Sequence, residues 1–364
     1  MKIEEFELNK LPEPLLHWFF GHARVLPWRE NPTPYRVWVS EIMLQQTRVE
    51  AVKPYFERFI QTLPEVAYLA ECQEEQLLKL WEGLGYYNRV RNMQIAAKQI
   101  MEEYHGQIPS EYDELLKLKG IGHYTAGAIA SIAYGKEVPA VDGNVLRVIS
   151  RVAADERDIM KQSVRSNMEK ELLQVIPKGR AGAFNQALME LGATVCLPKN
   201  APKCMECPWQ EICLSRKEGK IAQIPVKSKA AKRRIEEKTV FLIRDGEKII
   251  LRKRPAKGLL AGMYEFPNEA GVYTTEEVLS YTKDLGLTPL RIESLAEAVH
   301  VFSHVEWHMK GYLVRVEAIE EDREGCLFVE TSDFKENYPI PSAFAAYTEY
   351  LNIRQGKERF KKSE

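Results

Sequence analysis

The chain has 364 residues, of which 45% are hydrophobic, 10% aromatic and 28% charged. These proportions are typical of a globular protein and exclude disordered, collagen-like and disulfide-scaffold classes. With ~150 residues in a typical domain, the length predicts two or three folded units. Lys plus Arg (51) against Asp plus Glu (52) leaves a net charge of −1. Any nucleic-acid binding must therefore come from local basic patches.

The sequence leads us to expect neither a targeting segment nor a membrane span. No run approaches the ~18 apolar residues of a membrane span. The first ten residues, MKIEEFELNK, are too acidic for a secretory signal. We therefore expect no membrane partner and a cytoplasmic, nucleoid-associated location.

From Leu15 to about Cys213, apolar residues recur three and four positions apart, as in VEAVKPYFERFIQTL. This period predicts an all-helical unit. Within it, LLKLKGIGHYTAGAIASIAYG predicts a helix that starts at a capping box in 110–113, a tight turn at Gly120 to Gly122, and a second helix from about Tyr124 to Tyr134. Glycine N–H groups at the start of a helix form an anion site that suits a DNA phosphate, although G-x-G alone is more often only a turn.

Two carboxylates are candidates for chemistry. Asp142 precedes a helical run in AVDGNVLRVISR, where a role as helix N-cap, worth roughly 1 kcal/mol, explains it without catalysis. Glu41 lies among apolar residues in VWVSEIMLQQTRVE. In the first turn of a helix, Glu41 would be stabilised as a charge by the helix dipole. Apolar surroundings would instead raise its pKa and keep it protonated near neutrality, as a general acid requires.

Four of the six cysteines, Cys196, Cys204, Cys207 and Cys213, follow the spacing C-x7-C-x2-C-x5-C, whereas the other two are isolated. In a reducing cytosol this cluster favours metal binding over disulfides. Tetrahedral zinc usually takes paired C-x2-C knuckles, whereas a [4Fe–4S] cluster needs one thiolate per iron and tolerates unequal spacing. The single C-x2-C favours iron–sulfur over zinc.

The composition and the hydrophobic pattern of the sequence change after the cysteines. Residues 214–238 carry nine Lys or Arg against three Glu without an apolar period, which predicts a linker that could contact phosphate or simply be solvated. TVFLIR, the turn Asp245-Gly246 and KIILRKR then predict a hairpin. VEWHMKGYLVRVE predicts another strand, and a helix is expected from Thr275 to near Leu285. Residues 239–356 are therefore expected to form an α+β domain, followed by a charged tail at 357–364.

Taken together, the glycine hairpin, an Asp some twenty residues beyond it, the four cysteines and an appended α+β domain resemble the endonuclease III superfamily. Within it, LPWR, SEIMLQQTRV, WEGLGYY, GIGHYTAGAIAS, VDGNVLRV and FNQALMELG are similar to the motifs of the MutY-type adenine DNA glycosylases. The resemblance implies a multidomain fold. An all-α helix-hairpin-helix glycosylase domain would span 1–213, with a [4Fe–4S] loop at 196–213, and a MutT-like, Nudix-derived domain would span 239–356. The family spacing C-x6-C-x2-C-x5-C is here longer by one residue.

The resemblance also implies an activity, namely removal of adenine mispaired with 8-oxoguanine or guanine in double-stranded DNA by a monomeric enzyme. It assigns Glu41 to protonate adenine, Asp142 to stabilise the sugar cation and Asn144 to orient the carboxylates. Tyr124 stands where bifunctional relatives have a Schiff-base lysine, which implies excision without strand cleavage. The remaining roles fall to Arg24 and Trp28 in the adenine pocket, and to Gln46, Tyr86, Gly120, Gly122, Phe302, Ser303 and His304 as DNA contacts, of which the last three face 8-oxoguanine.

Two other functions fit part of the sequence. An endonuclease III-type glycosylase/lyase acting on oxidised pyrimidines is disfavoured by Tyr124 and by the extra domain. A non-catalytic iron–sulfur protein that binds DNA or transfers electrons is disfavoured by the coexistence of Glu41 and Asp142. The second domain lacks the REx2EE run of Nudix hydrolases, so we expect no pyrophosphatase activity from it.

Overall fold

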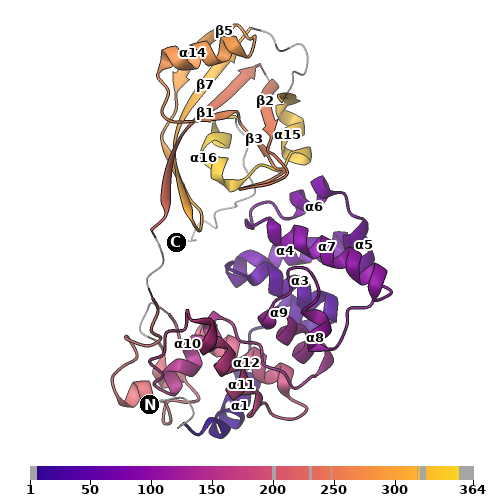
Figure 1. Cartoon of the computed structure of the whole chain (residues 1–364), viewed down its shortest axis with the longest axis vertical. Coiled ribbons are helices and arrows are strands. Elements are labelled where there is room, and N and C mark those ends of the chain that lie inside the picture. The colour runs from indigo at the N-terminus through magenta and orange to yellow at the C-terminus, as the bar shows by residue number, and fades with distance from the viewer. Residues whose placement is uncertain are drawn as a thin grey trace. The chain divides into compact units, whose positions relative to one another are not determined.

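The structure is a computed structural model that describes residues 6–198, 202–228, 232–246, 248–317, 319 and 325–351. The chain divides into two compact units (Figure 1). The first comprises Met1–Glu71 and Arg91–Lys229, and the second comprises Cys72–Val90 and Ala230–Glu364. The sequence did not indicate that 72–90 would group with the second unit. The expected tail at 357–364 lies outside the described residues.

The first unit is helical, as predicted, and no strand occurs in its described residues. In chain order, the helices up to residue 103 are α1 (Pro12–His22), α2 (Pro27–Glu30), α3 (Pro34–Leu44), α4 (Val49–Thr62), α5 (Val66–Glu71), α6 (Glu74–Leu80) and α7 (Asn88–Glu103). Of these, α6 lies within 72–90, and α7 begins there. They are followed by α8 (Tyr112–Leu115), α9 (His123–Ala128), a π-helical segment (Ile129–Ala133), α10 (Gly143–Val152), α11 (Gln162–Leu173), α12 (Ala181–Thr194) and α13 (Leu214–Lys217). No helix among the described residues combines the length and apolar character that crossing a bilayer requires.

The predicted glycine hairpin lies between α8 and α9. Gly120 has a φ of 80°, and a Cβ there would lie 2.7 Å from the Cβ of Asn92, so glycine is required at this position. Gly122 is the N-cap of α9. The capping box expected at 110–113 was wrong, because α8 has Glu111 as its N-cap with no side-chain cap bond. The Ser110 hydroxyl instead donates to the Glu111 carboxylate (3.2 Å).

The helices that carry the two candidate carboxylates begin at side-chain caps. At α3, the Thr33 hydroxyl accepts a hydrogen bond from the Arg36 N–H, and Pro34 occupies the first turn. At α10, Asp142 accepts from the Val145 N–H (2.7 Å). α12 packs against both α10 and α1 in a core that includes the fully buried Phe184.

Glycines allow the close approach of segments around the site. A Cβ at Gly127 in α9 would lie 2.1 Å from the Pro139 carbonyl oxygen. A Cβ at Gly192 in α12 would lie 2.7 Å from the Cβ of Asn144 at the start of α10. Since neither approach leaves room for a side chain, these glycines fix how near α9 and α12 lie to the chain around Asp142.

The second unit contains a mixed sheet in the order β3-β2-β1-β7-β5, with β4 paired to β1, β6 to β7 and β8 to β2. β1 and β7 pair in parallel and the other pairs are antiparallel. The strands are β1 (Arg234–Asp245), β2 (Lys248–Lys253), β3 (Tyr264–Glu265), β4 (Asn268–Ala270), β5 (Pro289–Ser294), β6 (Ala298–Val301), β7 (Val305–Val316) and β8 (Leu327–Glu330). The helices are α14 (Thr275–Asp284), α15 (Thr331–Asn337) and α16 (Ala345–Thr348).

The sheet has a separate core on each face. One core includes Val278 and the stacked rings of Phe241 and Tyr281, which join α14 to the sheet. The other includes Phe334 and Tyr347, from α15 and α16. The predicted α14, the β1–β2 hairpin and β7 are all confirmed. α13 and the start of β1 fall inside the segment expected to be a linker.

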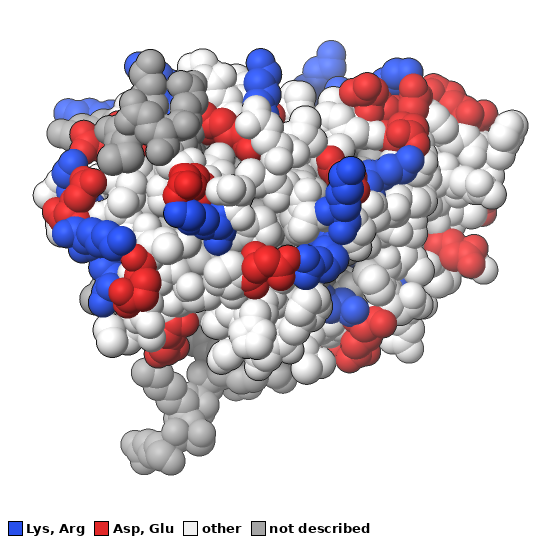
Figure 2. Space-filling view, turned by 90° about the horizontal axis from the view of Figure 1, so that it is seen from below, with Lys and Arg blue, Asp and Glu red and all other residues white. Residues whose placement is uncertain are grey.

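Charged side chains of both signs are scattered among other residues on the face drawn in Figure 2. On the face drawn in Figure 2, Lys and Arg are interspersed with Asp and Glu, without a large field of one sign. This distribution agrees with the net charge of −1. Contacts with a polyanion on that face must therefore be local.

We predict that Gly127→Ala lowers the free energy of unfolding by about 1–3 kcal/mol, because its Cβ must displace the Pro139 backbone. The matched control is Gly21→Ala in α1, where nothing lies within 4 Å of the added Cβ. It should stabilise by up to about 1 kcal/mol. Urea unfolding followed by circular dichroism measures both. Equal stability of the two variants would contradict the close approach.

Candidate active site

A pocket open to solvent lies in the first unit among α2, α3, α9, α11, α12 and the start of α10. It brings together predicted site residues that are as much as 120 positions apart in the chain. Those that line it are Arg24, Trp28, Glu41, Gln46, Tyr124, Asp142 and Asn144. The other predicted DNA contacts, Tyr86, Gly120, Gly122, Phe302, Ser303 and His304, do not line it.

Glu41 lies near the C-terminal end of α3 and is 5% exposed. The alternative of a first-turn Glu stabilised by the helix dipole is therefore wrong. Burial raises the pKa of Glu41 to about 7, and the negative charge of Asp142 adds to this shift. The hydrogen bond from the Tyr124 hydroxyl and the charge of Arg29 oppose it. A large fraction of Glu41 is thus protonated at neutral pH.

Asp142 is both a helix cap and a carboxylate in the pocket. One of its oxygens accepts from the Val145 N–H (2.7 Å) and the other from the Asn144 side-chain amide (2.7 Å). Burial raises the pKa of Asp142, and these two hydrogen bonds oppose the rise because they favour the ionised form. The two carboxylates therefore have different environments, one mainly apolar and one rich in N–H donors.

Tyr124 connects α9 to α3. Its hydroxyl donates to Glu41 and lies 3.1 Å from the Met189 sulfur. Burial and the charge of Glu41 raise the pKa of Tyr124 well above its usual value, so Tyr124 remains a neutral donor. No amine nucleophile occupies this position.

Glu190, which was not predicted from the sequence as a site residue, is 1% exposed in α12. Its carboxylate accepts from Arg24 Nε (2.6 Å), Arg24 Nη2 (3.0 Å) and the Arg24 backbone N–H (3.2 Å), and from Arg29 Nη2 (2.8 Å). These bonds join residues 161 and 166 positions apart. The sequence did contain a signal for this residue, because Glu190 is a carboxylate within the apolar run FNQALMELG. A charge buried in such a run requires a partner of opposite charge.

A second arginine connects the pocket to the cysteine loop. Arg147 Nη2 donates to the Asn144 side-chain oxygen (3.0 Å) and to the Gly192 carbonyl (2.8 Å). Arg147 Nε donates to the Cys196 carbonyl (2.9 Å). Because Asn144 in turn donates to Asp142, hydrogen bonds run without interruption from Asp142 to the backbone of Cys196.

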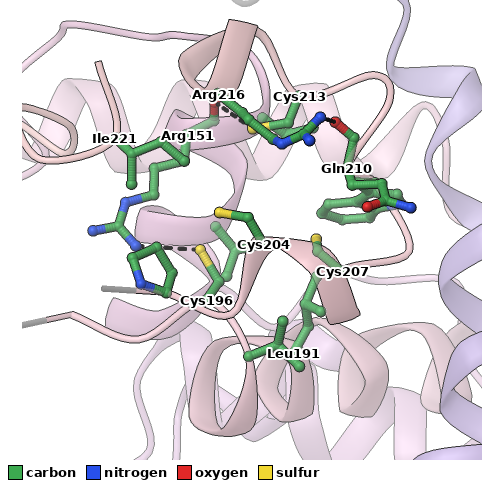
Figure 3. Close-up of a pocket in the computed structure, with 14 residues that line it drawn as sticks. Arg151, Leu191, Cys196, Cys204, Cys207, Gln210, Cys213, Arg216 and Ile221 are labelled. Atoms are coloured by element: carbon green, nitrogen blue, oxygen red, sulfur yellow. Dashed lines mark hydrogen bonds between the residues drawn. The ribbon is translucent and has the colours of Figure 1, made fainter. Parts of the chain in front are cut away.

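All four clustered cysteines border one pocket in the first unit, as Figure 3 shows. Burial and the charges of the neighbouring cysteines together raise the pKa of the Cys207 thiol to about 12. Four thiolates at such a site require positive charge to compensate them, which a metal centre provides. Arg151 Nη1 lies 3.3 Å from the Cys196 sulfur. In the described part of the chain, no group of three or more His, Cys, Asp or Glu is arranged to hold a single metal ion.

Two predicted DNA contacts have left-handed backbone conformations. Gln46 follows α3 with a φ of 61°, and Tyr86 has a φ of 49°. Such values are uncommon for residues other than glycine and concentrate at functional sites. Gln46 is exposed and lines the pocket, whereas Tyr86 is 49% exposed within 72–90, where Arg89 lies over its ring (5.6 Å).

Phe302, Ser303 and His304 form the turn between β6 and β7, as expected. The Phe302 N–H donates to the Val305 carbonyl (2.9 Å). The Phe302 ring packs edge-on against Trp307 (4.8 Å between ring centres). Ser303 and His304 are exposed. Phe302 thus anchors the turn, while the two polar side chains face solvent.

Comparison with known proteins agrees with this geometry. Residues 39–177 match the HhH-GPD superfamily base excision DNA repair protein family, and residues 239–350 match the NUDIX domain. A solved thermostable thymine-DNA glycosylase superposes with a TM-score of 0.53 at 25% identity, over 58% of this chain and 97% of that one. An endonuclease III–DNA complex shares the fold, with a TM-score of 0.51 at 23% identity over 60% and 98%.

Curated relatives cover more of the chain. The adenine DNA glycosylase of Arabidopsis thaliana is 36% identical over 356 residues, and that of Rattus norvegicus 35% over 363. Each match covers 83% of this chain, but 56% of the plant protein and 70% of the rat protein. The adenine DNA glycosylase of Buchnera aphidicola from Acyrthosiphon pisum is 32% identical over 310 residues, which cover 84% of this chain and 87% of the relative.

The helical fold, the glycine hairpin and the pocket with its two carboxylates therefore define a DNA N-glycosylase of the helix-hairpin-helix base excision repair class. The appended NUDIX domain and the similarity to adenine DNA glycosylases over most of the chain identify the family within this class. The chain belongs to the adenine DNA glycosylase family.

We predict that Glu41→Gln stabilises the protein above neutral pH. The folded state keeps the Glu41 proton up to about pH 7, whereas an unfolded Glu loses it near 4.5. Wild-type stability therefore falls as the pH rises between these values, and Gln, which does not titrate, escapes the loss. The advantage of the variant should grow from pH 5 and level off above pH 7, at up to about 3 kcal/mol. Urea unfolding at a series of pH values measures it. A constant difference between the proteins would contradict the raised pKa.

Proposed function

We propose that the protein excises adenine mispaired with 8-oxoguanine, or with guanine, by hydrolysing its N-glycosidic bond. The observation that carries the proposal is the unlike pair of carboxylates in one pocket, with Glu41 buried at a pKa of about 7 and Asp142 held by N–H donors. Such a pair supplies a proton to the leaving base and a negative charge to the sugar. The names of the relatives supply the base, adenine.

Extrusion of the nucleotide comes first, because a base within a duplex hides its glycosidic bond. Unstacking costs a few kcal/mol, which is least for a mispaired base. Gln46, exposed at the rim of the pocket, would fill the gap left in the stack, and Tyr86 would insert beside 8-oxoguanine. The turn at Gly120 and Gly122 would offer backbone N–H groups to a phosphate.

In the pocket, Glu41 would protonate adenine at N7 and later help to activate water. Asp142, ionised, would stabilise the oxocarbenium-like sugar, either as a neighbouring charge or through a covalent adduct. Asn144 holds Asp142 through a 2.7 Å hydrogen bond, which supports its role in orienting that carboxylate. Trp28, buried and edge-on to Phe56 (5.4 Å), and Arg24 would form the walls around adenine.

Excision would leave an abasic site without efficient strand cleavage. A lyase step needs an amine to form a Schiff base with the sugar. The position in the hairpin motif where bifunctional relatives carry that lysine holds Tyr124, whose hydroxyl is committed to Glu41. The enzyme is therefore proposed to be monofunctional.

The four cysteines are proposed to hold a [4Fe–4S] cluster. Cys196, Cys204, Cys207 and Cys213 would each ligate one iron. When bound, the cluster would cross-link the loop and compensate the charge of the thiolates. The donor set supports this proposal, because all four thiols border one pocket and Arg151 contacts the Cys196 sulfur.

We predict that Asp142→Asn binds duplexes with A opposite 8-oxoguanine nearly normally but excises adenine at least ~10²-fold more slowly, because charge stabilisation of the transition state is lost. Single-turnover assays with end-labelled duplexes and alkali treatment measure excision opposite 8-oxoguanine, guanine and thymine. Near-normal excision would reduce Asp142 to a helix cap. Strand cleavage by the wild type without alkali would contradict the monofunctional assignment.

We predict that the purified protein absorbs broadly near 400 nm and that Cys204→Ser loses this absorption, as expected for a [4Fe–4S] protein. The control is Cys72→Ser, which alters a cysteine that does not line the pocket and should keep the colour. A colourless wild type with one bound zinc would contradict the iron assignment.

We predict that the NUDIX domain supplies recognition of 8-oxoguanine. Ser303→Ala combined with His304→Ala removes two exposed hydrogen-bonding groups and leaves the packed Phe302 in place. Each base contact is worth about 1–3 kcal/mol, so the preference for A opposite 8-oxoguanine over A opposite G should shrink at least ~5-fold while excision from A opposite G changes little. His308→Ala, on β7 but away from the turn, serves as control. Equal loss on both substrates would point to general DNA affinity instead.

A further inference from the structure

Glu190 is the most buried charged side chain of the pocket, and nothing in the mechanism proposed above uses it. It is held from two sides, since Arg24 binds both of its oxygens and Arg29 binds one of them. Arg24 and Arg29 both line the pocket as well. Arg29 also donates to the Arg24 carbonyl (3.1 Å), so the two arginines and Glu190 form one connected group.

The charge of this group matters because the reaction creates positive charge. Protonation makes adenine cationic, and departure of the base leaves a cationic sugar. Two arginines in the pocket wall oppose both changes, since like charges in a partly buried site repel strongly. One carboxylate that pairs with both arginines removes half of that opposition and also fixes where the guanidinium groups lie.

We propose that Glu190 is a positioning residue for adenine excision. It holds Arg24 and Arg29 in the wall of the pocket and reduces their positive field while adenine and deoxyribose become cationic. This inference rests on the function proposed above and goes beyond it by assigning a role to the buried acid of α12.

The four hydrogen bonds and the 1% exposure of Glu190 support a fixed geometry. The hydrogen bonds from Arg24 and Arg29 also keep the pKa of Glu190 below its ordinary value despite burial, so the carboxylate is charged at working pH. A negative charge at this depth would be costly without the arginines, and the arginines would be unbalanced without it.

Several charged or titratable groups bear on Glu41, whose protonation provides the readout. Tyr124 from α9 donates to it, Asp142 raises its pKa, and Arg29 lowers it. Removal of the Glu190 charge leaves Arg29 uncompensated and so should lower the pKa of Glu41. The further charged groups that line the same pocket are Arg24, Arg48, Arg165 and Glu190.

The experiment measures single-turnover excision of A opposite 8-oxoguanine from pH 5.5 to 9.5. In the wild type, the rate should fall as the pH rises through about 7, when Glu41 loses its proton. In Glu190→Gln, this fall should move down by about one pH unit, so the rate should drop about threefold at pH 6.5 and about tenfold at pH 8.5. Glu190→Asp, which keeps the charge, should recover most of the profile.

A second pair of variants tests the same inference if Glu190→Gln alone does not fold. Arg24→Gln/Glu190→Gln removes one charge of each sign, so its profile should lie about one pH unit below that of Arg24→Gln alone. The matched control is Asp155→Asn, which breaks an equally buried carboxylate–arginine pair with Arg157 away from this pocket. It should lower the melting temperature without moving the profile.

The outcomes separate this inference from the function on which it rests. If the wild type excises adenine and Glu190→Gln, or the paired variants, show an unmoved profile, the role of Glu190 is overturned and the proposed function stands. If Asp155→Asn shifts the profile as much as Glu190→Gln does, the effect is general destabilisation and the inference also fails. Absence of excision by the wild type would overturn the proposed function, and this inference with it.

Discussion

The burial of Glu41 beside Asp142 is the constraint on which the arrangement of the first unit depends. A carboxyl group in an apolar site is favoured as the acid, and here its pKa is raised to about 7. Burial raises the pKa of Asp142 as well, but the hydrogen bonds from Val145 and Asn144 oppose that rise and favour its ionised form. Asp142 is fixed as the N-cap of α10, and the Tyr124 hydroxyl donates to Glu41. Both contacts therefore affect the difference in pKa between the two carboxyl groups.

Two residues of α12 contact the side chains that surround the two carboxylates. Gly192 lets the helix approach Asn144 closely, and Glu190, two residues earlier, binds Arg24 and Arg29. Arg147 then continues the contacts to the backbone of the cysteine loop. A metal centre at that loop would be tied to the pocket through short hydrogen bonds, so the loop and the pocket form one structural region.

Some features with local chemical causes were predictable from the sequence, although the capping box expected at 110–113 was wrong. The helix expected from Thr275 begins there, after a capping box at Thr274, and the Asp245-Gly246 turn joins β1 to β2. The apolar neighbours of Glu41 indicated its raised pKa. Features that depend on distant partners were not predictable, because no local pattern encodes a contact such as that of Glu190 with Arg24, 166 positions away. The grouping of 72–90 with the second unit is of the same kind.

The central claim is that the fold raises the pKa of Glu41 to about 7, so that a large fraction of it is protonated at neutral pH, while the hydrogen bonds to Asp142 favour the ionised form of that carboxylate. Carbon-13 NMR titration of the side-chain carboxyls, with Glu41→Gln and Asp142→Asn to assign the two resonances, measures both directly in the free protein. The account predicts that Glu41 titrates near pH 7 and that Asp142 titrates at lower pH. A Glu41 resonance that titrates near 4.5, the ordinary value for this side chain, would contradict it.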